Sequence, residues 1–186
     1  MPCSARSRGF SLMELLFVLI IVATLVCLAL PALGDALART QLSGGVNQWM
    51  TTLANARGNA VSRGHNVVVC PAAAGSCVVS SHWHRGWIMF EDRNRNAEYD
   101  PDEPLLLQGG HDDSLRIVSN NGRQRVRYRP DGTAEGTNLT LTFCGRRGAA
   151  YARSIVLNNA GRARSGKPSP EQAAAACAAP SYHEGP

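Results

Sequence analysis

Apolar side chains follow one another almost without interruption near the start of the chain. From Phe10 to Leu33 the only charged side chain is Glu14. A helix needs about 20 apolar residues to cross a bilayer, so this run predicts a transmembrane helix over residues 10–33. A carboxylate inside a membrane-spanning segment is costly and usually has a function, which makes Glu14 a candidate functional residue.

Beyond residue 33 the apolar positions recur every three or four residues, the period of a helix with one buried face. Gly64 is a natural terminator for this pattern. We therefore expect one helix from Phe10 to Arg63, whose continuation over residues 34–64 packs an apolar stripe against a sheet. The stripe consists of Leu42, Val46, Trp49, Met50, Leu53, Ala56, Ala60 and Val61.

Residues 65–177 change to short apolar runs bounded by Gly, Pro, Asn or Asp, which is the pattern of strands and turns. Pro130-Asp131-Gly132 marks a turn between two of these runs. A long helix packed on antiparallel sheet is an α+β fold. The expected strands are Val67–Cys70, Cys77–Ser80, Trp87–Phe90, Leu105–Leu107, Leu115–Val118, Arg125–Tyr128, Leu139–Phe143 and Ser154–Leu157.

The C-terminal segment is rich in Pro, Ala and Ser after Lys167. We expect a short helical turn at Glu171–Cys177, followed by a disordered tail over residues 178–186.

Charge is distributed unevenly along a chain whose net charge is +5. Glu91–Asp113 contains eight acidic and two basic residues, whereas Arg116–Lys167 contains eleven basic and two acidic ones. Such an imbalance indicates a polyanionic partner or charge pairing between subunits.

Four of the six cysteines lie within residues 65–177, and an oxidising compartment would permit two disulfides there. Four cysteines allow three pairings. We favour Cys70–Cys77, which closes a short loop, and Cys144–Cys177, which ties down the C-terminal segment. Zinc held by four thiolates is the alternative, but the chain lacks the closely paired cysteines of zinc knuckles.

The junction before the apolar run resembles the class III signal of type IV pilins and pseudopilins. It is carried by Gly9, Phe10 and Glu14, which lies five positions into the run. The resemblance implies that a prepilin peptidase cuts after Gly9, removes a leader of residues 1–9, and methylates Phe10. It also implies that Glu14 pairs with the terminal amine of a neighbouring subunit during assembly. An ordinary membrane anchor with an isolated glutamate is the alternative.

Arg6 and Arg8 would keep the leader in the cytoplasm under the positive-inside rule. We therefore expect a single-pass inner-membrane protein with its C-terminal domain in the periplasm. From there it would enter an extracellular pilus or a periplasmic pseudopilus.

A second resemblance is found near the C-terminus, where Ser154–Leu157 is followed by Asn158–Arg164. These residues resemble the end of the GspH/FimT family of minor pilins, as do the Gly86–Phe90 segment and the cysteine pattern. In the FimT branch a G-R-x-R motif belongs to DNA binding during natural transformation. Gly161, Arg162 and Arg164 match that motif.

The chemistry of these residues suits a phosphate backbone. Two arginines one residue apart on an extended segment point the same way, and each can form forked contacts with phosphate oxygens. Such contacts give salt-sensitive, sequence-independent binding to double-stranded DNA. A solubilising turn is the alternative. The residues expected to widen the basic patch are Arg146, Arg147, Arg153 and Lys167.

Two further patterns leave alternatives open. Arg123, Arg125, Arg127 and Arg129 alternate along an expected strand, so they form either a second DNA contact or a solvated face. Asp92–Glu103 spaces its oxygen ligands like a calcium loop, although Ala97 stands where the sharp turn needs glycine. An Asx-rich hairpin tip gives the same pattern, and we expect neither a metal nor a cofactor.

Ser, His and Asp are present, but no spacing resembles a catalytic motif. We therefore expect no enzyme. The two resemblances together imply a minor pilin of the FimT type, which binds extracellular DNA and supports its uptake and pilus biogenesis. Its other partners would be pilins or pseudopilins of the same filament. The alternatives are a structural pseudopilin of type II secretion, similar to GspH, and a minor pilin that only primes assembly.

Overall fold

The computed structural model describes residues 11–110, 114–120, 123–134, 136 and 138–178. The predicted cleavage site at Gly9 and Phe10 and the predicted disordered tail, apart from its first residue, lie outside these residues. The chain divides into two compact units, Met1–Leu37 and Ala38–Pro186.

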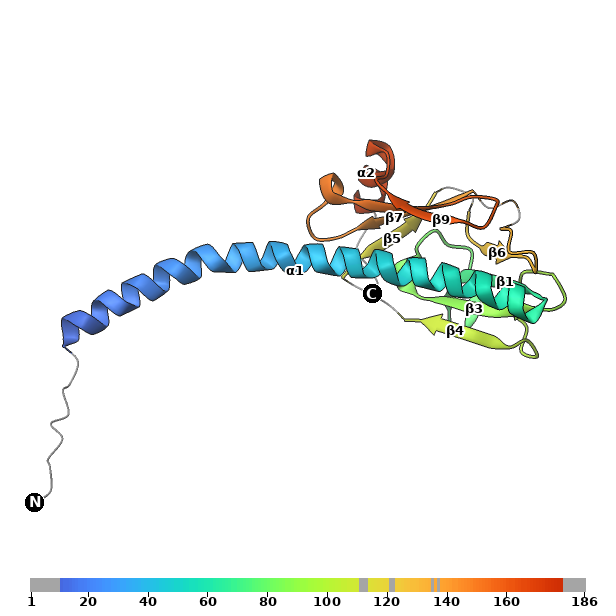
Figure 1. Ribbon diagram of the computed structural model, residues 1–186, viewed down its shortest axis with the longest axis horizontal. Coiled ribbons are helices and arrows are strands. Elements are labelled where there is room, and N and C mark those ends of the chain that lie inside the picture. The colour runs from blue at the N-terminus through green and yellow to red at the C-terminus, as the bar shows by residue number, and fades with distance from the viewer. Residues whose placement is uncertain (1–10, 111–113, 121–122, 135, 137, 179–186) are drawn as a thin grey trace, which may run out of the picture. The chain divides into compact units, whose positions relative to one another are not determined.

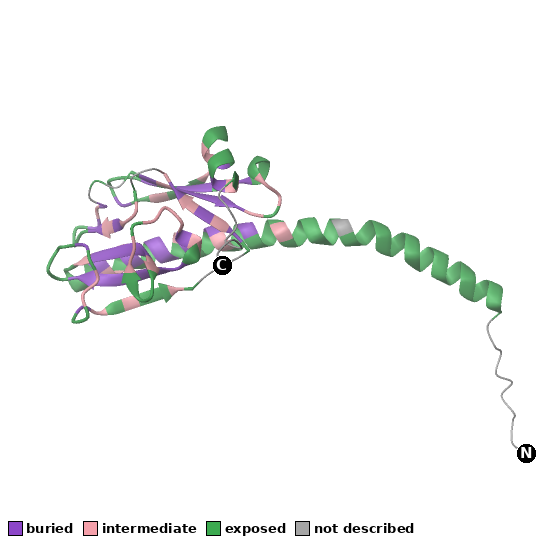
Figure 2. Ribbon diagram, turned by 180° about the vertical axis from the view of Figure 1, so that it is seen from behind, coloured by how far each residue is buried: buried purple, intermediate pink, exposed green. Residues whose placement is uncertain are grey.

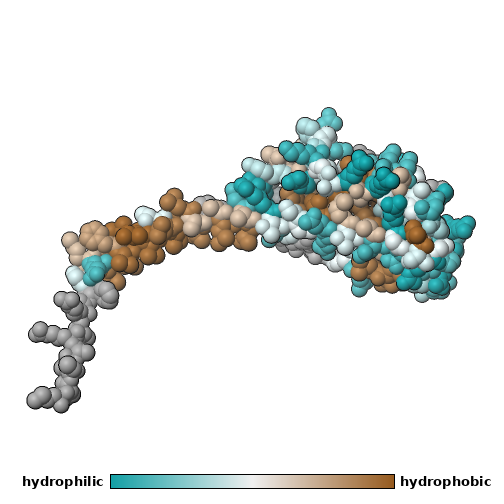
Figure 3. Space-filling view, in the orientation of Figure 1, coloured by the Kyte–Doolittle hydropathy of each residue, from teal (hydrophilic) through white to brown (hydrophobic). Residues whose placement is uncertain are grey.

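One long helix, α1 (Leu12–Arg63), begins in the first unit and ends in the second. Among the described residues it is the one helix long and apolar enough to cross a membrane, and its most apolar window has a mean hydropathy of 2.9 and is not buried. Figure 3 shows mostly hydrophobic side chains on the visible face of its first part. Glu14 lies in the first turn of this apolar part.

The second unit contains two antiparallel sheets (Figure 1). The first has the strand order β2-β1-β3-β4, with β6 also paired to β1. Its strands are β1 (Asn66–Ala73), β2 (Ser76–Cys77), β3 (Trp87–Asp92), β4 (Leu105–Gly109) and β6 (Val126–Tyr128). The second has the order β5-β7-β8-β9, with β5 (Arg116–Ser119), β7 (Leu139–Cys144), β8 (Arg153–Leu157) and β9 (Ala163–Gly166).

The larger of two hydrophobic clusters among the described residues joins the second part of α1 to both sheets, and the smaller one, which includes Val68 and Phe90, packs on the other face of the first sheet. Most of the predicted stripe is buried in the larger cluster, with Leu53 at 1% exposure, whereas Val61 is exposed. Figure 2 shows the buried positions concentrated where the sheets meet the helix. Every core side chain comes from Leu42 or later, so we expect residues 36–186 to fold without the membrane segment.

Most expected strands are present, with small changes at their ends. The strand expected at Cys77–Ser80 is reduced to Ser76–Cys77. Strand β9 was not expected as a strand. Both predicted disulfides, Cys70–Cys77 and Cys144–Cys177, are formed. The second one fastens α2 (Pro170–Ala178), which is longer than the expected turn, to the second sheet.

Glu91 on β3 is a buried carboxylate that connects the sheet to the end of α1. It accepts a hydrogen bond from Nε of Arg93 at 2.8 Å and another from Nη1 of Arg63 at 3.2 Å. Nε2 of His65 lies 3.9 Å away. The hydrogen bond from Arg93 is the main cause that holds the pKa of Glu91 below its usual value of 4.5, whereas burial acts in the opposite direction.

Glu91→Gln should lower the free energy of unfolding by about 2 kcal/mol at neutral pH, because two charge-assisted hydrogen bonds are weakened. The folded pKa is the lower one, so this stabilisation is complete above the unfolded pKa near 4.5 and disappears as the pH falls through the folded pKa. Urea unfolding of both proteins across this range measures the difference.

Glu98→Gln is the matched control. Glu98 also pairs with an arginine, but its side chain is 65% exposed, so its loss should cost under about 0.5 kcal/mol. Equal costs for the two variants, or a Glu91→Gln difference that does not shrink in acid, would contradict the assignment.

Candidate nucleic-acid interface

The predicted G-R-x-R motif begins in the turn between β8 and β9, with Gly161 and Arg162, and ends in β9, which contains Arg164. Asn158 holds its backbone, because its carbonyl accepts the amide of Gly161 at 2.9 Å and its Oδ1 accepts the amide of Arg162 at 3.0 Å. Gly161 has a φ of +73°, in the left-handed region that favours glycine. The turn therefore has one defined backbone conformation.

Gly161 is buried against the turn between β6 and β7. A Cβ at this position would overlap the carbonyl oxygen of Gly132. The same carbonyl accepts a hydrogen bond from Nε of Arg57 on α1 at 2.9 Å. The amide of Ala134 donates to the carbonyl of Asn159 at 3.0 Å. These contacts fix the tip of the hairpin relative to α1 and β6.

A groove of about 670 Å³, which we call the hairpin groove, lies between α1 and the β8–β9 hairpin. It brings together three arginines, with Arg57 half-buried and Arg162 and Arg164 exposed. No carboxylate is among the described residues that line it. The remaining lining residues are Met50, Leu53, Ala54, Gly58, Val61, Ser62, Tyr128, Gly161 and Ala163.

The wall of the hairpin groove contributes no negative charge. Tyr128 is 1% exposed, and its burial raises the pKa of the phenol above its ordinary value, although Arg57 acts in the opposite direction. The phenol is therefore neutral at physiological pH, and the charged side chains among the described lining residues are all positive.

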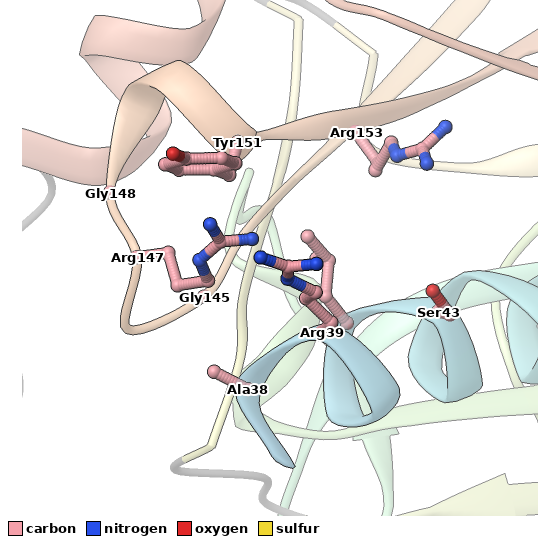
Figure 4. A pocket seen from close by; sticks show the side chains of 9 residues that line it. Ala38, Arg39, Ser43, Gly145, Arg147, Gly148, Tyr151 and Arg153 are labelled. Atoms are coloured by element: carbon pink, nitrogen blue, oxygen red, sulfur yellow. The ribbon is translucent and has the colours of Figure 1, made fainter. Parts of the chain in front are cut away.

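Two of the other predicted DNA-binding residues line a different pocket (Figure 4). This Arg39 pocket has a volume of about 430 Å³ and contains Arg39, Arg147 and Arg153 together with Tyr151. The guanidinium carbon of Arg147 lies 3.4 Å from the centroid of the Tyr151 ring, in a cation–π contact. The predicted basic patch is therefore divided between two sites.

The division follows from where each site meets α1. Arg153, at the start of β8, lines the pocket that contains Arg39, whereas Arg162 and Arg164 line the groove that contains Arg57, about five turns further along the helix. Of the remaining predicted residues, Arg146 is exposed on the loop after β7. Lys167 lines a third pocket, beside the start of α2.

The alternating arginines do not form a free basic face. Nη2 of Arg125 lies 3.0 Å from Oε1 of Glu98, and Nε of Arg127 lies 3.9 Å from Oδ2 of buried Asp92. Part of the charge imbalance is therefore neutralised by ion pairs within the chain, in addition to the two expected alternatives of a polyanionic partner and pairing between subunits.

The acidic loop after β3 uses most of its polar groups internally. The side-chain amides of Asn94 and Asn96 both donate to Oδ2 of Asp100, at 2.7 and 2.9 Å. Glu103 accepts the backbone amide of Arg93 at 2.8 Å. In the described part of the chain, no group of three His, Cys, Asp or Glu side chains could hold a metal ion.

Sequence reasoning missed the two arginines contributed by α1. Arg57 and Arg39 lie about 100 residues before the motifs that they accompany, and nothing near them indicates a site. Both arginines flank the predicted apolar stripe. Arg57 lies between Ala56 and Ala60, and Arg39 lies three residues before Leu42. Positions that flank a buried stripe border the contact between the helix and the sheet, and this is the signal by which the two arginines could have been identified.

Comparisons with known proteins agree with this fold. The model of a family described as type II transport protein GspH matches residues 45–161. The pilin-like protein PilA1 of Thermus thermophilus is 29% identical over 170 residues, covering 84% of this chain and 97% of the relative. The type IV minor pilin FimU of Pseudomonas aeruginosa, solved in two crystal forms, has a similar fold at 16% identity. Its two structures give TM-scores of 0.54 and 0.52, covering 75% and 67% of this chain and 96% and 92% of theirs.

Proposed function

The chain belongs to the GspH family, and from this premise we propose that it is a minor pilin that binds double-stranded DNA without regard to sequence. It would support DNA uptake in natural transformation and pilus biogenesis. The observation that carries this proposal is the hairpin groove, where Arg57, Arg162 and Arg164 lie together without a carboxylate among the described lining residues.

Three arginines over an apolar wall suit the phosphate backbone rather than base edges. Guanidinium groups fork onto phosphate oxygens and release condensed counterions, which gives affinity without base discrimination. Several subunits along one filament, each of which binds DNA weakly, would together bind it more tightly through avidity.

The proposal includes the route to the cell surface. A prepilin peptidase would cut after Gly9 and methylate Phe10, and the apolar part of α1 would hold the subunit in the inner membrane with its globular unit in the periplasm. Glu14 would then pair with the terminal amine of a neighbouring subunit, because a carboxylate in hydrocarbon requires a cation.

A structural role in type II secretion is the second candidate, and the description of the matching family favours it. In that case the partners are other pseudopilins and the basic groove has no ligand. DNA binding by the purified globular unit separates the two functions.

Residues 36–186 should bind labelled duplex DNA of any sequence in an anisotropy titration. Arg162→Gln with Arg164→Gln should lower the affinity about 10- to 100-fold at low salt. The slope of log affinity against log salt should fall in magnitude by about two, because two phosphate contacts are lost. Circular dichroism of the double variant should match wild type, since both side chains are exposed.

The control is Arg39→Gln with Arg153→Gln, which removes the same charge from the other pocket. It should weaken DNA binding much less. Equal losses in the two double variants would mean that net charge alone attracts DNA, and the groove would have no special role. If wild-type residues 36–186 do not bind DNA at low salt, the secretion function is favoured.

A further inference from the structure

Strand β4 is an edge strand with an apolar side. In the described part of the chain it pairs only with β3. Leu105 and Leu107 are each 42% exposed, and Figure 3 shows a hydrophobic patch where Figure 1 labels this strand. Edge strands of soluble proteins usually carry charged residues or proline, which prevent pairing with another chain. The sequence of β4, Leu-Leu-Leu-Gln-Gly, contains neither, so its free edge can accept another strand.

The charges beside β4 determine which strand it can accept. Asp100 and Asp102 precede it, and Asp112 and Asp113 follow it in the sequence. The β4 strand of a second copy would therefore bring like charges together in either a parallel or an antiparallel pairing, which is unfavourable. A strand with basic residues on both sides is the complementary partner.

Strand β9 is an edge strand with these charges. In the described part of the chain it pairs only with β8. Arg162 precedes it, Arg164 lies within it and Lys167 follows it, and all three side chains are exposed. Its four residues match the five of β4 in length. The two strands belong to different sheets and lie on opposite sides of α1 in Figure 1, so one molecule can offer them to two different neighbours.

The hairpin groove beside β9 suits the exposed leucines. Its volume is about 670 Å³, and the wall contributed by α1 includes Met50, Ala54 and the exposed Val61. A strand added to the free edge of β9 would lie over this wall. The leucines of β4 would there lose apolar surface to the groove, which favours association.

We propose that β4 of one molecule adds to the β9 edge of a second copy and occupies its hairpin groove. The acidic residues beside β4 then face the basic residues of β9. Because the two surfaces differ, the contact is head-to-tail and can continue from subunit to subunit instead of closing a pair. The contact also excludes DNA from an occupied groove, whereas subunits with an open groove remain available to it. Only this last consequence rests on the proposed function.

Sedimentation velocity of residues 36–186 over a range of concentrations measures the contact. The wild type should self-associate, and less so as salt increases. Leu105→Gln with Leu107→Gln removes apolar surface from β4, and Arg162→Gln with Arg164→Gln removes charge from β9. Each double variant alone should self-associate about 10- to 100-fold more weakly than the wild type.

A mixture of the two double variants tests the direction of the contact. One supplies an intact β9 and the other an intact β4, so the mixture should associate with wild-type affinity and stop at a one-to-one pair. Val79→Gln is the control, since it removes a 79% exposed apolar side chain outside both strands and should leave self-association unchanged. The proposal is overturned by a wild type that stays monomeric at about 1 mM, by a double variant that self-associates like the wild type, or by a mixture that associates no better than its components.

Labelled duplex DNA supplies the second readout. An excess of the Arg162 and Arg164 variant, which keeps β4, should displace DNA from the Leu105 and Leu107 variant, whose groove is intact. Pairing without this displacement would overturn the placement of β4 in the groove. Pairing in the mixture with no DNA binding by the wild type would refute the DNA function and support the contact. DNA binding with no pairing would refute the contact alone.

Discussion

Gly161→Ala should lower the free energy of unfolding of residues 36–186 by about 2–4 kcal/mol. The φ of +73° alone costs about 1 kcal/mol for alanine. The added Cβ would also overlap the carbonyl oxygen of Gly132, which is backbone and already bonded to Arg57. The hairpin tip must move away from the β6–β7 turn to remove this overlap. The overlap therefore lowers the free energy of unfolding further, by at least as much as the unfavourable φ does. Urea unfolding measures the change.

The same substitution should weaken DNA binding even though no charge is removed. Moving the tip separates Arg162 from Arg57, which line one groove in the wild type. We therefore expect a lower affinity with a smaller change in salt slope than the double arginine variant gives, because the phosphate contacts become misaligned rather than absent.

Gly44→Ala is the matched control. Gly44 lies within α1, and a Cβ there would meet no atom within 4 Å. Alanine should stabilise the helix by about 0.5–1 kcal/mol. A Gly161→Ala protein as stable as wild type would show that the hairpin tip is not seated on the Gly132 carbonyl, and the groove would lose its structural basis.

Local pattern was sufficient for most of the elements. The stripe in α1 predicted a half-buried helix because its period matches one face of a helix, and Leu53 and Ala56 are indeed buried. Strand β9 escaped prediction because Ala163-Arg164-Ser165-Gly166 has no apolar alternation. It is an edge strand that β8 specifies through pairing, so tertiary context and not its own composition makes it extended.

The candidate site was predicted only in part, because its residues are brought together or separated by folding and not by local sequence pattern. Sequence proximity suggested one patch from Arg146 to Lys167, but its members meet α1 at different places. Arg153 lies in the pocket with Arg39, whereas Arg164 lies in the groove with Arg57, further along the helix, so the patch divides. Arg57 and Arg39 could not be assigned, because α1 meets the hairpin and the β7–β8 loop only after folding.

Removing the Cys144–Cys177 disulfide by serine at both positions should lower the free energy of unfolding by about 4 kcal/mol. The bridge closes a loop with a sequence separation of 33 residues, and the lost loop-closure entropy of the unfolded chain accounts for a stabilisation of about 4 kcal/mol. It also seats α2, whose Ala173 and Ala176 are buried and whose Cys177 carbonyl accepts a hydrogen bond from Nη1 of Arg116. In the variant α2 should become accessible to proteases before the rest of the unit unfolds.

Serine at Cys70 and Cys77 is the comparison, since this bridge has a separation of only seven residues and should be worth about 2.5 kcal/mol. Urea unfolding and timed proteolysis of the two double variants rank the bridges. Because α2 lies apart from the hairpin groove, the Cys144 and Cys177 variant should retain wild-type DNA affinity wherever it remains folded. A larger cost for the short loop, or a protected α2 without its bridge, would show that packing rather than the covalent link retains this helix on the sheet.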